Sequence, residues 1–158
     1  YPFHAGITES GGLLAGSIKS AAGLTLLLRE GLADTIRVSL TADPQEEVRA
    51  GYLILSSLGI RQHGPILISC PVCGRCEVDL AAVAKEVESR LIPLKENITV
   101  AVMGCMVNGP GEAREADIGV ACGRGIGVIF RKGRILRKVK EDAIVDELMR
   151  EIEHHSEK

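Results

Sequence analysis

The sequence predicts a fold that passes from α/β to α+β, in two successive parts. In residues 1–62, short apolar strands alternate with helices, an order that normally builds a parallel sheet or a barrel. In residues 63–158, several strands follow one another between two helices, as in a compact α+β domain. Leu, Ile, Val and Ala must build both cores, because the 158 residues hold two Tyr, two Phe and no Trp.

The first part predicts strand, helix, strand, helix in that order. We expect strands at 1–9 and 35–41, where apolar and polar residues alternate, and a helix at 11–31 between them. Asp43-Pro44 is a strong start for the second helix, with Asp43 as its cap. Its predicted inward face consists of Val48, Tyr52, Leu55 and Leu58.

Polar residues on the second strand indicate a pocket. Arg37 and Ser39 alternate with apolar residues there. A strand between two helices has its outer face covered, so these side chains should point to the other face. In a β/α barrel that face is the interior, and ligands bind at the carboxyl ends of the strands. Two units cannot close a barrel of eight, so we expect residues 1–62 to be part of a larger barrel.

The second part predicts five strands and two helices. The strands are expected at 66–69, 98–103, 118–121, 127–130 and 134–138. A helix capped by Asp79 follows the first strand, and a helix at 142–155 ends the chain. Their predicted inward faces are Leu80, Val83, Ala84, Val87 and Leu91 in the first helix, and Ile144, Leu148, Met149 and Ile152 in the second.

Two glycine-rich loops carry cysteines, and each loop follows a predicted strand. Cys70 and Cys73 lie in SCPVCG, and Cys105 and Glu112 lie in GCMVNGPGE. Three such thiolates can hold an iron–sulfur cluster, and a carboxylate can complete the site while leaving one iron exchangeable. Zinc is the rival interpretation of a single C-x-x-C. Cys122 is predicted to be a buried, inert thiol.

Composition excludes some classes of partner. The net charge of −2 gives no overall attraction to nucleic acid or anionic membranes. No apolar run approaches the roughly 20 residues of a membrane span, and the start of the sequence does not resemble a signal peptide. Five cysteines at local spacing favour a reducing compartment and metal-bound thiols, so we expect a cytoplasmic protein.

Four segments together carry a resemblance to a known family. SCPVCGR, VAVMGCMVNGPGEAREADIG, HAGITESGG and DTIRVSLTADP closely resemble the 4-hydroxy-3-methylbut-2-enyl-diphosphate synthases, iron–sulfur enzymes of the methylerythritol phosphate pathway of isoprenoid biosynthesis. The resemblance implies the terminal β/α units of a TIM-type barrel, followed by a cluster domain resembling part of sulfite and nitrite reductases. It covers essentially the whole chain.

The resemblance also implies a cofactor and a reaction. A [4Fe–4S] cluster would be held by Cys70, Cys73, Cys105 and Glu112, and Glu112 could leave so that a substrate oxygen binds iron. The family reaction opens the ring of 2-C-methyl-D-erythritol 2,4-cyclodiphosphate and removes a hydroxyl with two electrons. The alternative is a non-catalytic ferredoxin-like electron carrier or a zinc-binding module.

Further roles follow by matching positions to the family motifs. Arg37 and Ser39 would contact the diphosphate, and Glu9 would handle a proton or a substrate hydroxyl. The remaining candidates for substrate binding are Lys19, His4 and Asn108. Each candidate also has a non-functional interpretation. Arg37 and Ser39 could lie on a solvated strand face. Lys19 could be a surface residue, His4 could have only a positional role, and Asn108 could be a turn residue. Cys76 and Cys122 depart from the family pattern and could mis-ligate or oxidise.

The resemblance finally implies partners. The electron donor would be a flavodoxin or a ferredoxin, and the cluster domain of one subunit would close over the barrel of the other in a homodimer. These 158 residues alone are then expected to bind a cluster without turnover. The basic residues of 131–140 form either a solvated hairpin or a docking patch for the acidic donor. They are Arg131, Lys132, Arg134, Arg137, Lys138 and Lys140.

Overall fold

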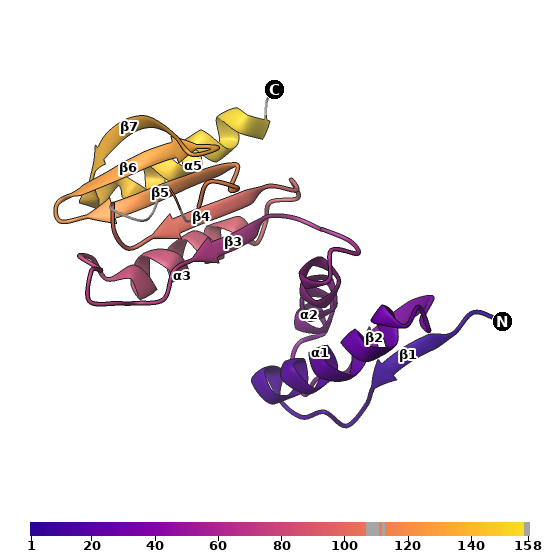
Figure 1. Ribbon diagram of the computed structural model, residues 1–158. Coiled ribbons are helices and arrows are strands. Elements are labelled where there is room, and N and C mark those ends of the chain that lie inside the picture. The colour runs from indigo at the N-terminus through magenta and orange to yellow at the C-terminus, as the bar shows by residue number, and fades with distance from the viewer. Residues whose placement is uncertain (107–110, 112, 157–158) are drawn as a thin grey trace. The chain divides into compact units, whose positions relative to one another are not determined.

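A computed structural model describes residues 1–106, 111 and 113–156. The chain divides into two compact units, Tyr1–His63 and Gly64–Lys158, each with its own strands and helices (Figure 1). We call them unit 1 and unit 2.

Unit 1 contains two parallel strands and two helices. Its elements are β1 (His4–Ile7), α1 (Leu13–Arg29), β2 (Thr35–Val38) and α2 (Pro44–Ser57). The side chain of Asp43 caps α2 by accepting a hydrogen bond from the N–H of Gln45 at 3.0 Å, as predicted. Both helices pack on one face of the strand pair, around a core of Ala5, Leu24, Val38, Ala50 and Ile54.

The orientation of α2 differs from the prediction. Ala50 and Ile54 face the core, whereas Val48, predicted to point inward, is 61% exposed. The helix carries apolar residues on more than one side, so the hydrophobic pattern alone does not select the buried one. Gly51 lies near β2, where an added Cβ would come within 3.8 Å of Val38, so the small face of α2 packs against the strands.

Unit 2 is a five-stranded sheet with helices on one side. Its strands are β3 (Ile66–Ser69), β4 (Thr99–Met103), β5 (Ile118–Gly123), β6 (Ile126–Arg131) and β7 (Arg134–Lys140). They lie in that order across the sheet. The first three are parallel, and β6 runs antiparallel to both its neighbours. The β6–β7 turn places Lys132 and Gly133 at positive φ, as hairpins of this length require.

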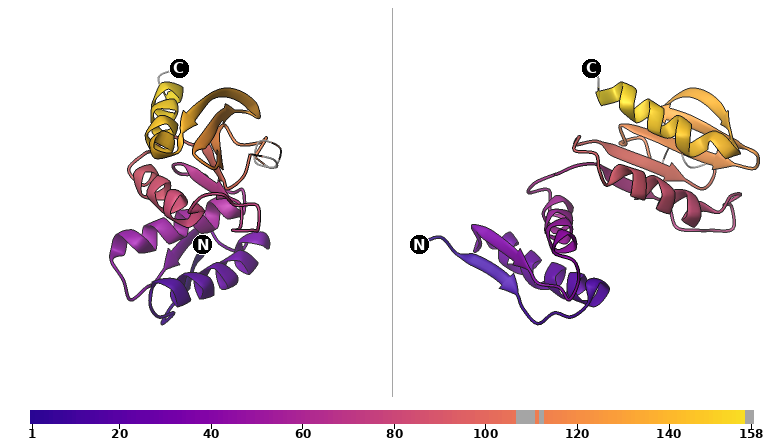
Figure 2. Two further views of the ribbon diagram at one scale, coloured as in Figure 1. Left: turned by 90° about the vertical axis from the view of Figure 1, so that its left-hand side faces the viewer. Right: turned by 180° about the vertical axis from the view of Figure 1, so that it is seen from behind.

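Helices α3 (Leu80–Leu91) and α5 (Ile144–Ser156) cover the same face of the sheet of unit 2. Seen from behind, they lie side by side on it (Figure 2). The helices and the sheet enclose one buried core, and it confirms the inward faces predicted for both helices except at Ala84, which is not part of it. The core includes Leu80, Val87, Leu91, Val100, Val120, Ile144, Leu148 and Ile152. On the other face of the sheet, Ala113 and Ala116 of the segment between β4 and β5 pack against residues of the strands. These residues are Ala101, Met103, Ala121 and Phe130.

The prediction of a mixed α/β fold with parallel strands is therefore confirmed. Among the described residues, none of the helices combines the length and the apolar character needed to cross a membrane.

Candidate functional site

The cysteine loops leave the sheet of unit 2 at one edge. Cys70 directly follows β3, and Gly104-Cys105 follow β4. The two strands are parallel neighbours, with Ser69 beside Val102, so both loops start at the same carboxyl edge. The N–H of Gly104 donates a hydrogen bond to Cys70 Sγ at 3.3 Å. Two of the predicted cluster ligands thus lie on adjacent loops, with a backbone N–H directed at a sulfur.

Cys73 lies exposed in the turn after Cys70. Hydrogen bonding from the backbone N–H of Arg75 lowers the pKa of its thiol, against a smaller opposing effect of burial. The Arg75 side chain and the N–H of Cys76 lower the pKa further. The thiolate is the metal-binding form of cysteine, so this turn favours the state that a ligand needs.

Cys122 and Cys76 lie on the side of the sheet that the helices cover. Cys122 is fully buried, and burial raises the pKa of its thiol to about 12. It stays protonated and inert, which confirms the prediction of a buried thiol. Cys76 is half-buried, and its thiol donates to the carbonyl oxygen of Val78 at 3.3 Å.

The donor chemistry fits a cluster bound through thiolates, because Cys70, Cys73 and Cys105 come from neighbouring loops and Gly104 offers an N–H to sulfur. Within the part of the chain that the structure describes, no three His, Cys, Asp or Glu side chains are already gathered as a metal-ion site. Glu112 and Asn108 lie outside the described residues. Ala113 packs in the same cluster of side chains as Cys70, on the sheet face opposite the helices.

Unit 1 places two candidate side chains on the face of its strands that the helices leave uncovered. Gly6 is paired with Arg37, and a Cβ added at Gly6 would lie only 3.4 Å from Arg37 Nε. The side chain of Arg37 therefore lies beside the backbone of Gly6 in β1. On the same face, His4 Nδ1 lies 2.7 Å from Thr35 Oγ1.

Other candidates of unit 1 gather where the strands end. Glu9 follows β1 and Ser39 follows β2, and Ser10 Oγ between them donates to the carbonyl oxygen of Ser39 at 2.5 Å. Glu9 has a φ of 56°, an unusual backbone state for a residue other than glycine. His4 begins β1 and so lies at the opposite end of that strand, while Lys19 is exposed on α1.

Two residues near the cysteines were missed by the sequence reasoning. Gly104 supplies an N–H to Cys70, and Arg75 acts on the thiol of Cys73. The signals were present in the sequence, since a glycine directly precedes Cys105 and a cation stands two residues after Cys73.

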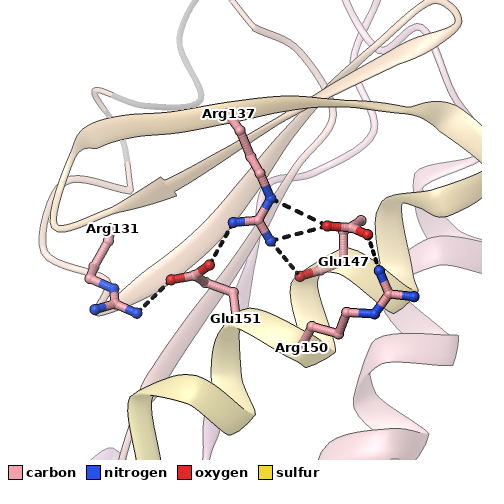
Figure 3. Close-up of polar contacts among 5 residues, drawn as sticks. All are labelled: Arg131, Arg137, Glu147, Arg150 and Glu151. Carbon is pink, nitrogen blue, oxygen red and sulfur yellow. Dashed lines mark hydrogen bonds and ion pairs between the residues drawn. The ribbon is translucent and has the colours of Figure 1, made fainter. Parts of the chain in front are cut away.

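The basic hairpin is neither wholly solvated nor wholly available for docking. Arg131 pairs with Glu151 at 2.5 Å, and Arg137 pairs with Glu151 at 2.7 Å and with Glu147 at 3.1 Å (Figure 3). Arg150 completes the group through Glu147. Two of the six basic side chains thus bind the hairpin to α5.

Four basic side chains of the hairpin are left exposed: Lys132, Arg134, Lys138 and Lys140. The strand β7 that carries three of them lies at the far edge of the sheet from β3. Lys140 lies near the carboxyl edge that holds the cysteine loops, and Lys132 lies at the opposite edge. A docking role for this hairpin stays a prediction.

Comparison with known proteins gives matches along both units. The family model described as the GcpE protein C-terminal domain matches residues 66–154, and the GcpE TIM-barrel domain matches residues 1–52. Relatives named 4-hydroxy-3-methylbut-2-en-1-yl diphosphate synthase (flavodoxin) include those of Geobacter sulfurreducens, 58% identical, and Clostridium perfringens, 60% identical. Each alignment covers 97% of this chain, and the chain spans 43% and 44% of the two relatives' lengths.

Proposed function

The chain belongs to the GcpE family, and on this basis we propose that it carries the iron–sulfur part of a 4-hydroxy-3-methylbut-2-en-1-yl diphosphate synthase. The proposed reaction is the reductive ring opening and dehydroxylation of 2-C-methyl-D-erythritol 2,4-cyclodiphosphate. In this proposal residues 1–62 belong to a TIM-type barrel, and residues 63–158 form a cluster domain resembling part of sulfite and nitrite reductases.

The observation that carries the proposal is that Cys70 and Cys105 follow the ends of adjacent parallel strands. The N–H of Gly104 also donates a hydrogen bond to the Cys70 sulfur. Cys70, Cys73, Cys105 and Glu112 would hold a [4Fe–4S] cluster, which when bound supplies electrons and Lewis acidity. The carboxylate of Glu112 is the hardest and weakest of the four ligands, so its position is the one a substrate oxygen would take.

The residues of unit 1 would orient the substrate. Arg37, whose side chain lies beside Gly6, would present a guanidinium suited to two phosphate oxygens of the diphosphate. Ser39 and Glu9 lie at the carboxyl ends of their strands, where β/α barrels bind ligands. There Glu9 would hold a proton or a substrate hydroxyl. The remaining proposed substrate contacts are Lys19, His4 and Asn108.

The proposed partners follow from the family. The electron donor would be a flavodoxin, as in the relatives' names, or a ferredoxin. We propose a homodimer in the cytoplasm, in which the cluster domain of one subunit closes over the barrel of the other. Neither nucleic acid nor a membrane is part of this proposal.

The first prediction concerns the cluster itself. The chain purified without oxygen should be brown and contain iron and sulfide in near-equal amounts, with broad absorption in the visible range. Cys105→Ser should lose most of the iron, because one of three thiolate ligands is removed. Cys122→Ser is the matched control and should keep the iron, since its thiol is buried and protonated.

Two results would count against the cluster. A colourless protein with stoichiometric zinc would favour the zinc-binding module. A Cys105→Ser protein with the same iron content and spectrum as the unmodified chain would remove Cys105 from the ligand set.

A further inference from the structure

The loop after β3 contains a second cysteine pair, Cys73-Gly74-Arg75-Cys76. The N–H of Cys76 donates to the carbonyl oxygen of Cys73 at 3.0 Å. A hydrogen bond of this spacing closes a β-turn, which keeps the end Cα atoms within about 7 Å. A disulfide requires Cα atoms at about 4.4–6.8 Å. The turn therefore holds the Cα atoms of Cys73 and Cys76 at a distance that allows a disulfide.

The two thiols differ in their access to solvent. Cys73 is exposed, whereas Cys76 is half-buried against the core beneath the helices. The Cys76 thiol is held there by its hydrogen bond to the carbonyl oxygen of Val78 at 3.3 Å. An exposed thiol with a second thiol close behind it is the arrangement that turns oxidation into a reversible disulfide.

The other cysteines are less accessible. Cys122 has no exposed surface. Cys70 is half-buried, and its sulfur accepts a hydrogen bond from the N–H of Gly104. Cys105 is also half-buried and lies in the next loop. A small oxidant in solution therefore reaches Cys73 first, and its neighbour across the turn is Cys76.

We propose that Cys73 and Cys76 form a reversible disulfide in the cluster-free protein, made by hydrogen peroxide and undone by a dithiol. The sulfur of Cys73 attacks one peroxide oxygen, which gives a sulfenic acid and one water. The sulfur of Cys76 then attacks Cys73, which forms the S–S bond and releases a second water. Two thiols lose two electrons and two protons, and one peroxide is reduced. A dithiol reverses the step by exchange.

The bridge has a consequence for cofactor loading, and this part rests on the proposed function. Cys73 is a proposed cluster ligand, so the disulfide blocks cluster assembly while it lasts. The disulfide also prevents further oxidation of the Cys73 sulfur to sulfinic or sulfonic acid, which a dithiol does not reduce.

Trypsin gives a direct test, because it cuts between the two cysteines after Arg75. The cluster-free chain is treated with peroxide, alkylated and digested to peptides 62–75 and 76–85. A Cys73–Cys76 bridge joins these peptides, with a mass loss of two hydrogens. A Cys70–Cys73 bridge stays within peptide 62–75. We expect the joined pair in the unmodified chain and in Cys70→Ser and Cys122→Ser, and its loss in Cys73→Ser. Its absence from the unmodified chain, or its persistence in Cys73→Ser, overturns the proposal.

Iron uptake tests the protective role. After peroxide and then dithiothreitol, the unmodified chain should take up as much iron as before treatment. Cys76→Ser should not recover, and its Cys73 should carry two or three added oxygens. Full recovery of Cys76→Ser overturns the protective role. If the untreated, reduced chain takes up no iron, the proposed function fails, while the joined peptides still decide the disulfide.

Discussion

Gly119 shows how a single residue fixes the packing of one sheet face. It lies in β5 beside Phe130 of β6, and a Cβ at this position would lie 2.8 Å from Phe130 Cε2 and 2.9 Å from Ala101 Cβ. The ring of Phe130 therefore lies over Gly119 without exposed surface. Ala113 and Ala116 pack against the same cluster, which ties the segment after Glu112 to the sheet.

Gly119→Ala should destabilise unit 2 by about 1–3 kcal/mol, because a methyl group is forced into a filled site. The midpoint of urea unfolding measures the effect. Gly74→Ala is the matched control, since nothing lies within 4 Å of its added Cβ. Phe130→Leu makes room, so the double variant should lose less than the sum of the two single losses. Strict additivity, or an unchanged midpoint for Gly119→Ala, would contradict this account.

Single residues could be predicted from sequence when their partners are close in the chain. Asp43 and Asp79 were recognised as helix caps because each bonds an N–H two or three residues later. The N–H of Gly104 was missed because the sulfur it bonds lies 34 residues away. Gly119 was missed for the same reason, since Phe130 meets it only through strand pairing.

At the scale of elements, the hairpin β6–β7 is attached to α5 by charge as well as by apolar packing. Glu151 of α5 is buried and accepts hydrogen bonds from Arg131 and Arg137. Burial alone would raise the pKa of its carboxyl, but the hydrogen bond from Arg137 and the two positive charges hold the pKa below its ordinary value of 4.5. Arg137 in turn has a raised pKa, chiefly from its hydrogen bond to Glu151.

This network makes the stability of unit 2 depend on pH. Because the folded-state pKa of Glu151 lies below the unfolded one, its contribution is complete above the unfolded value of about 4.5 and is lost as pH falls through the folded value. Glu151→Gln should cost about 2 kcal/mol at pH 7 and progressively less below pH 4.5, measured by urea unfolding across pH. The exposed Glu153 on the same helix supplies the control, Glu153→Gln. A loss that stays constant with pH would contradict the assignment.

The pattern of apolar residues predicted α3 and α5 well and α2 poorly. The apolar residues of α5 form one stripe and the rest of the helix is polar, so its buried face was unambiguous. They are Ile144, Val145, Leu148, Met149 and Ile152. In α2, Val48 and Leu53 are apolar yet exposed, and they compete in the pattern with the buried Ile54. The charge pairs between β7 and α5 could not be predicted, because their members approach only when the hairpin folds onto the helix.

At the scale of the whole chain, the cysteine site could be predicted because strands that follow one another in the sequence are also neighbours in the sheet. Cysteine loops after two strands predict a common edge if the strands are parallel neighbours, and β3 and β4 are. Unit 1 shows the limit of that reasoning. Its strands form a sheet of two, and several large apolar side chains of its helices are exposed. They include Leu14, Leu26 and Val48.

The two units therefore lead to different expectations for a protein of these 158 residues alone. Unit 2 has a complete core beneath its helices, so it should fold and bind the cluster. Two strands do not close a barrel, so the substrate site of unit 1 should lack most of its walls.

With a small-molecule reductant and the cyclic diphosphate, the 158-residue protein should show spectroscopic reduction of the cluster but no product. A full-length relative assayed in parallel should form product, and the exposed apolar side chains of unit 1 should make the 158-residue protein associate as its concentration rises. Measurable turnover by the 158 residues would contradict this division, because it would place the whole active site within them.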